Sequence, residues 1–143
     1  EELQRKLGKL HAREFGRGIL SAAANDMKDW LAQYPSSSEA NSPGRQRWYE
    51  RGFGSRWRTK SGAVHGSRTS ETLGRKWTMK VSQDGLSATV GNNVSYGPYV
   101  QGPEQTHFHK ARGWRSTEQA VREKGPEVLR KVKEAIAEAI ARG

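Results

Sequence analysis

The sequence predicts an α+β fold whose order is helix, long basic arm, small antiparallel sheet built on a β-hairpin, and helix. Apolar residues recur at helical spacing in residues 1–34 and 116–142, and they alternate with polar residues around an Asp-Gly pair within residues 73–102. The chain has 143 residues, which fits one domain spanning 1–143. Only 33% of the residues are hydrophobic, so we expect a small core and stabilisation by partners or by an oligomer.

The N-terminal helix is predicted from a stripe of apolar residues. The stripe consists of Leu3, Leu7, Leu10, Ile19, Ala23, Met27, Trp30, Leu31 and Tyr34. Gly8, Gly16 and Gly18 each lower helix stability by up to ~1 kcal/mol relative to alanine. We therefore predict a frayed or kinked first half and a firm helix over 19–33, which Pro35 ends.

Residues 35–72 are predicted to form an extended basic arm or loop. Pro35 and the Asn41-Ser42-Pro43-Gly44 stretch break regular structure, and residues 45–58 have neither a helical nor a strand period. Residues 35–80 carry ten basic and three acidic side chains, which is +7 of the net +10. A concentrated basic segment indicates a polyanionic partner or an acidic protein surface.

Aromatic and basic side chains alternate in this arm. The aromatic residues are Trp48, Tyr49, Phe53 and Trp57, and the basic ones are Arg45, Arg47, Arg51, Arg56, Arg58 and Lys60. Three interpretations stay open. The aromatics could anchor a neighbouring subunit while the basic residues meet acidic groups, the arm could face nucleic acid, or the aromatics could cover the sheet beneath solvated arginines.

The hairpin is predicted from two alternating runs that flank Asp84-Gly85. The runs are Trp77, Met79, Val81 and then Leu86, Ala88, Val90. Glycine accepts the positive φ of a tight turn. After the hairpin, Gly91-Asn92-Asn93 tolerates left-handed backbone and Pro98 fixes φ, so the chain bends sharply. Tyr96 and Tyr99 are then expected to pack on a helix or on a neighbour.

The C-terminal helix begins with a predicted capping box at Ser116 and Gln119. Gly125-Pro126 interrupts it, and Pro126 either begins a new helix or kinks a continuous one. Beyond that point one apolar stripe consists of Val128, Leu129, Val132, Ala135, Ile136, Ala139 and Ile140.

Catalytic and metal-binding motifs are missing from the sequence. There is no cysteine, no G-x-S-x-G elbow, no phosphate-binding glycine loop and no motif of paired carboxylates. His107-Phe108-His109 could project two imidazoles to one side of an extended segment, but no third ligand lies at a metal-site spacing. We therefore expect no enzyme, no cofactor and no metal. No apolar run approaches the ~20 residues of a membrane span, and we expect a soluble protein made in a host cytoplasm.

The hairpin and its bend carry a resemblance to a known family. The residues concerned are Arg68-Thr69, residues 72–77 (TLGRKW), residues 85–93 (GLSATVGNN), residues 96–102 (YGPYVQG) and Gly113-Trp114. This ordered string resembles a family of small tailed-bacteriophage proteins, called minor tail, neck or tail-completion proteins, that complete the tail or join it to the head.

The resemblance implies a virion structural protein rather than an enzyme. It implies a homo-oligomeric ring around the DNA channel at the head–tail junction, with the phage connector or adaptor, the tail proteins and packaged DNA as partners. In that setting we expect Trp48, Tyr49, Phe53, Trp57, Tyr96 and Tyr99 at subunit or partner interfaces. Arg45, Arg47, Arg51, Arg56, Arg58 and Lys60 are expected to face DNA or an acidic partner. The alternative is a free basic nucleic-acid-binding protein that uses residues 45–60.

Overall fold

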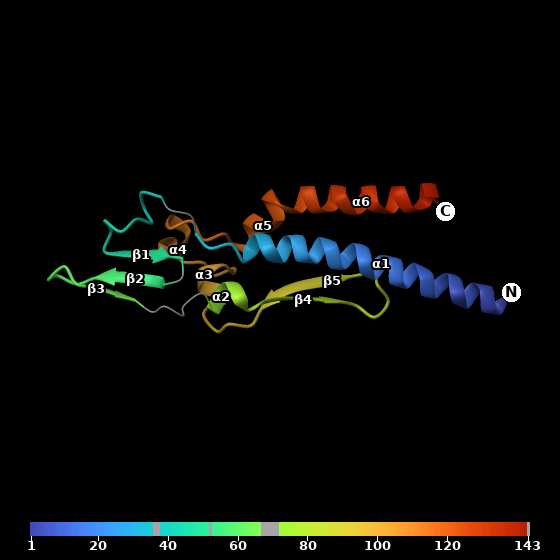
Figure 1. Ribbon diagram of the computed structural model, residues 1–143, viewed down its shortest axis with the longest axis horizontal. Coiled ribbons are helices and arrows are strands. Elements are labelled where there is room, and N and C mark those ends of the chain that lie inside the picture. The colour runs from blue at the N-terminus through green and yellow to red at the C-terminus, as the bar shows by residue number, and fades with distance from the viewer. Residues whose placement is uncertain (36–37, 52, 67–71, 143) are drawn as a thin grey trace. The chain divides into compact units, whose positions relative to one another are not determined.

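The structure of the chain is a computed structural model that describes residues 1–143 except 36–37, 52, 67–71 and 143 (Figure 1). The elements in chain order are α1 (Glu2–Leu31), β1 (Arg47–Glu50), β2 (Gly54–Arg58), β3 (Val64–Gly66), α2 (Thr72–Arg75), β4 (Trp77–Val81), β5 (Ala88–Asn92), α3 (Gly97–Val100), α4 (His107–Ala111), α5 (Thr117–Glu123) and α6 (Gly125–Arg142). The predicted α+β class is confirmed, and the two small sheets are antiparallel, in the orders β1-β2-β3 and β4-β5.

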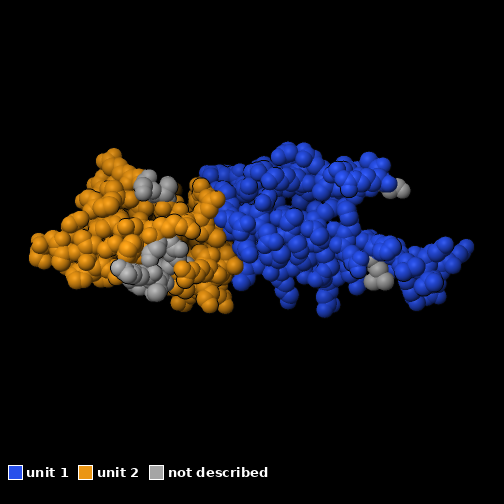
Figure 2. Space-filling view, viewed as in Figure 1, with its two compact units in different colours: residues 1–30, 78–91, 121–143 blue, residues 31–77, 92–120 orange. Residues whose placement is uncertain are grey.

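The chain forms two compact units where the sequence suggested one domain (Figure 2). Unit 1 consists of residues 1–30, 78–91 and 121–143, and unit 2 consists of residues 31–77 and 92–120. Each unit is therefore assembled from segments that are distant in sequence.

In unit 1, α1 is helical from Glu2, so the predicted fraying of its first half is wrong. A Glu2–Lys6 ion pair of 3.0 Å supports the first turn. Gly16 is where the hairpin turn approaches α1, because a Cβ at that position would lie 2.6 Å from the Gly85 carbonyl oxygen. Gly16 lowers the helix propensity of α1, but its missing side chain permits this contact.

The predicted hairpin is confirmed as β4 and β5 joined by a turn around Asp84-Gly85. Gly85 has the expected positive φ of 72°. The Ser82 amide donates to the Ser87 carbonyl at 2.9 Å and closes the turn. The Asp84 carboxylate accepts from the Ser82 hydroxyl and the Leu86 amide, and these two bonds lower the pKa of Asp84.

The predicted capping residue and the interruption near the C-terminus are both present. The Gln119 amide donates to the Ser116 hydroxyl at 3.0 Å, which caps the start of α5. α5 ends at Glu123, and α6 begins at Gly125 with Pro126 in its first turn. Pro126 therefore begins a new helix, which is one of the two alternatives that the sequence left open.

In unit 2, residues 47–50, 54–58 and 64–66 form β1, β2 and β3, and the prediction of a structureless arm is wrong for them. Trp48 supplies the reason, since only 3% of it is exposed and its burial anchors β1. The outer edge of β1 is closed by Asn41, whose side chain bonds both the amide and the carbonyl of Tyr49, at 2.6 and 3.2 Å. Within the predicted arm, residues 36–37, 52 and 67–71 lie outside the described residues.

The core of unit 2 is a cluster of Leu73, Val100 and Trp114. Tyr34, Tyr49 and Val94 pack against it. This core receives residues from three separate stretches of the chain. It is built around the bend after the hairpin, which forms the short helix α3.

Polar side chains, rather than left-handed backbone, fix that bend. No described residue other than glycine has a positive φ, and Asn92 acts through its side-chain amide instead. That amide donates to the Leu73 carbonyl at 2.7 Å and accepts from the Val94 amide at 3.1 Å. The expectation of left-handed asparagine is therefore corrected.

Candidate functional site

An aromatic pocket of about 310 Å³ lies on the surface of unit 2. Its lining residues are Tyr49, Ser55, Leu73, Tyr96, Tyr99, Val100, His109 and Trp114. Tyr49 and Ser55 are opposite each other in the β1–β2 register, so their side chains share one face of the sheet. The pocket is thus built on this sheet face and bordered by α3 and α4.

Tyr49 is the centre of the aromatic packing. Its ring meets Trp114 edge-on at 5.2 Å between centroids, Tyr34 at 6.2 Å and Phe108 at 6.5 Å. Edge-to-face pairs of this kind stabilise an aromatic cluster beyond the area that they bury. The inner wall of the pocket is therefore a packed aromatic cluster.

Tyr96 and Tyr99 form the exposed rim. They are 45% and 49% exposed, although each is a large aromatic residue. Half-exposed tyrosines beside a preformed apolar pocket are typical of protein interfaces, because their rings supply contact area with few rotatable bonds.

Two titratable groups in the pocket are shifted toward their neutral forms. Burial raises the pKa of Tyr49, against weaker opposing effects of Trp114 and Arg112. Burial also lowers the pKa of His109, and the nearby Arg112 charge adds to this. The Nδ1 atom of His109 lies 2.6 Å from the Thr106 hydroxyl. A ligand in this pocket therefore meets a largely uncharged, apolar surface.

Arg112 is a cation held beside this surface. Its guanidinium lies 3.5 Å from the centre of the Phe108 ring and donates to the carbonyls of Phe108 and Arg47, at 3.1 and 3.3 Å. These contacts fix the charge next to the pocket and close another stretch of the β1 edge.

Two glutamines hold the segment that carries the rim. Gln105 donates through Nε2 to the carbonyls of Val100 and Trp114, at 2.8 and 2.9 Å. Gln101 is 1% exposed, and its Nε2 donates to the carbonyls of Leu31 and Arg115. Buried amides with satisfied donors fix one backbone conformation.

The pocket brings together three of the six aromatic residues predicted at interfaces, namely Tyr49, Tyr96 and Tyr99. Phe53 is half-buried beneath the Arg56 guanidinium, which lies 4.4 Å from the ring centre. Trp57 is exposed and stacks on His65 with centroids 5.9 Å apart. Trp48 belongs to the interior of unit 2, so its side chain is not available to a partner in this fold.

The predicted basic residues are spread over the sheet instead of lining the pocket. Arg45 pairs with Glu39 at 3.2 Å, and the half-buried Arg56 pairs with Glu50 at 3.1 Å. Arg58 donates to backbone carbonyls of the neighbouring loops. The exposed members of the set are Arg45, Arg47, Arg51, Arg58 and Lys60. These side chains make a basic surface, but part of their charge is already compensated within the chain.

Several pocket residues have no signal in the sequence, and His109 is the clearest example. The His107-Phe108-His109 stretch forms α4 and is not extended, because the Thr106 hydroxyl accepts from the His109 amide and caps a helix. Two residues at i and i+2 of a helix do not share a face, so the expected common side for the imidazoles is wrong. Among the described residues no group of three metal-ligating side chains lies together.

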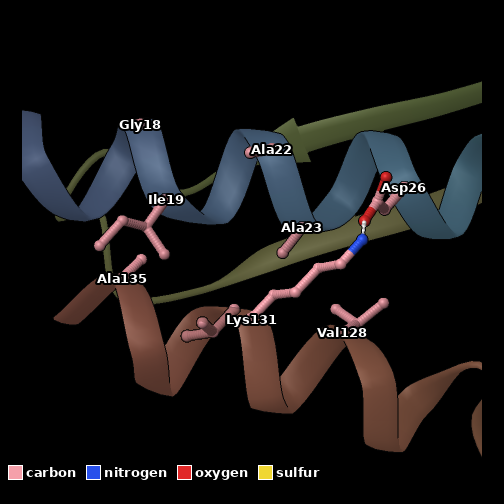
Figure 3. Close-up of a pocket in the computed structure, with 9 residues that line it drawn as sticks. Gly18, Ile19, Ala22, Ala23, Asp26, Val128, Lys131 and Ala135 are labelled. Carbon is pink, nitrogen blue, oxygen red and sulfur yellow. Dashed lines mark hydrogen bonds and ion pairs between the residues drawn. The ribbon is translucent and has the colours of Figure 1, made fainter. Parts of the chain in front are cut away.

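A second hollow is a groove of about 340 Å³ within unit 1, between α1 and α6 (Figure 3). Its walls consist of small or aliphatic residues, namely Gly18, Ile19, Ala22, Ala23, Val128, Val132 and Ala135. Lys131 of α6 crosses it to reach Asp26 of α1 at 3.1 Å, as Figure 3 shows. Asp26 and Glu127 together raise the pKa of Lys131.

Neither hollow presents a nucleophile with a base and an orienting carboxylate among its lining residues. None of the described helices is both long and apolar enough to cross a bilayer.

Comparisons with protein-family models, with curated proteins and with solved structures found no match for this chain. The aromatic pocket is suited to holding an apolar segment of another protein.

Proposed function

We propose that the protein is a virion structural protein of a tailed bacteriophage, a tail-completion or neck subunit that assembles as a ring at the head–tail junction. Its activity is assembly, and it performs no chemical reaction. The phage connector or adaptor and the tail proteins are its partners, and packaged DNA passes through the ring.

The observation that carries this proposal is the place of residues 96–102, the last long part of the family-like string, in unit 2. Residues 96–102 resemble the phage family most closely, and Tyr96, Tyr99 and Val100 of that string line the aromatic pocket. The two half-exposed tyrosines have no role in the core of unit 2, which Leu73, Val100 and Trp114 form. A partner that covers the pocket accounts for their exposure.

The composition supports the same proposal. A chain with few hydrophobic residues exposes several large ones, in both units, and this is typical of subunits that complete their core on assembly. Different surfaces that meet head to tail generate closed rings when the rotation closes.

The direct test is the number of copies in purified virions of the parent phage or induced prophage, measured by quantitative mass spectrometry. We expect a fixed, small number on the order of six or twelve, as a closed cyclic ring requires. Absence from particles, despite expression during infection, would overturn the proposal.

A free basic nucleic-acid-binding protein is the second candidate. Exposed Trp57 stacks on His65 and lies opposite Arg47 in the sheet register, which is a suitable surface for a base and a phosphate. Tight binding to short nucleic acids, with a steep fall in affinity as salt rises and a further loss in Trp57→Ala, would favour this candidate. Weak binding that moderate salt abolishes, unchanged in Trp57→Ala, would reflect net charge alone.

A further inference from the structure

Unit 1 has almost no core of its own. Among its described residues, Ala24 is the one hydrophobic side chain that is fully buried. Its large exposed hydrophobic residues are Leu3, Leu7, Phe15, Leu86, Val121, Leu129, Ile136 and Ile140. A unit of this size with so little buried area needs further contacts for stability.

α6 has two apolar faces, and the groove uses only one of them. Residues 128, 132 and 135 line the groove (Figure 3). Leu129, Ile136 and Ile140 lie about 100° further round the helix, and all three are exposed, Ile140 by 75%. Lys133 belongs to this outer stripe, because it lies one turn from Leu129 and two turns from Ile140.

α1 carries a matching stripe in its first half. Leu3 and Leu7 are one turn apart on the same side of the helix and are exposed, Leu3 by 70%. Glu14 continues that side two turns after Leu7, because seven residues are close to two helical turns. An isolated helical segment of this length is marginal in water and gains stability from a partner.

The two stripes carry opposite charges that have no ion-pair partner in the part of the chain that the structure describes. Glu14 and Lys133 are exposed, and neither forms an ion pair with another described residue. Glu14 lies seven residues after Leu7, and Ile140 lies seven residues after Lys133. An antiparallel pairing therefore brings Leu7 against Ile140 and Glu14 against Lys133 at the same time.

Identical stripes are poorer partners for one another. Two antiparallel α6 stripes that align Leu129 with Ile140 place each Lys133 against Ile136, and two antiparallel α1 stripes that span residues 3–14 place each Glu14 against Leu3. A charge that is covered by an apolar residue without an opposite charge disfavours these self-pairings, whereas the α1–α6 pairing joins opposite charges.

We propose that the outer stripe of α6 (Leu129, Lys133, Ile136, Ile140) binds the first half of α1 (Leu3, Leu7, Glu14) of a second copy of this chain. The contact joins two different surfaces, so it is heterologous and continues from copy to copy until a ring closes. It rests on the proposed ring assembly and names the surfaces that form it.

Engineered cysteines test the contact, because the chain has none of its own. Leu7→Cys protein is mixed with Ile140→Cys protein, and the mixture is oxidised and examined on non-reducing gels. We expect mixed disulfide dimers that neither variant forms alone. Arg5→Cys, on the opposite side of α1, is the matched control and should not cross-link to Ile140→Cys.

A charge exchange at two exposed positions gives a second readout. In sedimentation velocity, Glu14→Lys should weaken self-association about tenfold, and the double variant Glu14→Lys with Lys133→Glu should restore it. Glu14→Lys with Lys110→Glu is the matched control, because it has the same net charge but places the new carboxylate on exposed Lys110 of α4, outside both stripes. Restoration by Lys133→Glu and not by Lys110→Glu requires that positions 14 and 133 meet.

Four results would overturn the contact. These are dimers of Ile140→Cys alone in place of mixed dimers, equal cross-linking by Arg5→Cys, equal restoration by Lys110→Glu, and a protein that remains monomeric at every concentration tested. The proposed function is judged separately by the copy number in virions. Ring stoichiometry in particles without the mixed dimer removes this contact only, and mixed dimers of a protein absent from particles remove the phage role only.

Discussion

The indole nitrogen of Trp77 donates a hydrogen bond of 3.1 Å to the side-chain oxygen of Gln101, in the interior of unit 2. The amide nitrogen of the same glutamine donates to the carbonyls of Leu31 and Arg115, at 2.9 and 2.8 Å. One buried side chain thus joins the end of α1, the start of β4 and the segment before α5. The two amide hydrogens and the oxygen of the Gln101 side chain thus all form hydrogen bonds.

Replacing Gln101 with leucine should destabilise unit 2 strongly. The leucine keeps the approximate volume but leaves the Trp77 N–H and two carbonyls buried without these bonds, each at a cost of about 1–3 kcal/mol. We expect a loss of at least about 2 kcal/mol in the free energy of unfolding, measured with urea through tryptophan fluorescence. Gln83→Leu, at an exposed position in the hairpin turn, is the control. Equal stability of the two variants would contradict the role assigned to Gln101.

Alanine at Gly16 should destabilise unit 1, although alanine normally favours helices by up to ~1 kcal/mol over glycine. The new Cβ would lie 2.6 Å from the Gly85 carbonyl oxygen, so the hairpin turn must move away from α1. Gly8→Ala is the matched control, because nothing lies within 4 Å of a Cβ there. We expect Gly8→Ala to raise the melting temperature followed by circular dichroism and Gly16→Ala to lower it. A rise in both would show that the turn does not pack at Gly16.

The hairpin could be predicted from the sequence because all of its determinants are local. Alternation and an Asp-Gly turn within residues 77–90 define β4, β5 and the positive φ of Gly85. The cap of α5 by Ser116 is local in the same way. Elements of this kind depend on neighbours in the chain and little on tertiary contacts.

The β1–β2–β3 sheet could not be predicted because its determinants are distant or weak. The strands have only four, five and three residues, and Trp48 is the one large side chain of β1 that is fully buried. Asn41 closes the outer edge of β1 from a segment rich in breakers. A loop-like composition therefore concealed a short sheet.

The pocket was predictable in part. Tyr96 and Tyr99 were expected from the bend after the hairpin, and Tyr49 from the aromatic composition of residues 45–60. These tyrosines line one pocket with His109 because α4 packs near β1. No periodicity in the sequence predicts that tertiary contact. The stacking of Trp57 on His65 likewise depends on the register of β2 and β3.

Acidification should destabilise unit 2 through His109. Its pKa in the folded state lies below the ordinary value of 6.5, so the unfolded chain binds the proton more readily. Stability from the neutral form is therefore fully present above about pH 6.5 and is lost as the pH falls through that value toward the lower pKa of the folded state.

The measurement is the free energy of unfolding at about pH 8 and about pH 5.5, on either side of the ordinary histidine pKa, for the original chain and for His109→Asn. We expect the original chain to lose more stability on acidification than the variant. His107→Asn, at the exposed start of α4, should behave like the original chain. If His109→Asn showed the same pH dependence as the original, the shift in pKa would not contribute to stability.

Removing the rim of the aromatic pocket should weaken partner binding strongly without unfolding the protein. Tyr96 and Tyr99 are half exposed and lie outside the buried cluster of Leu73, Val100 and Trp114, so alanine at either position leaves the core intact. At an interface, an anchoring aromatic commonly contributes about 2 kcal/mol or more, which corresponds to a loss of affinity of roughly thirtyfold. Tyr96→Phe and Tyr99→Phe keep the ring area and should bind almost normally.

The measurement is joining of heads to tails in lysates that lack the original protein, with circular dichroism to confirm the fold. Normal joining by the Tyr96→Ala/Tyr99→Ala double variant would show that the pocket does not receive the partner, because no aromatic rim would then remain to hold it.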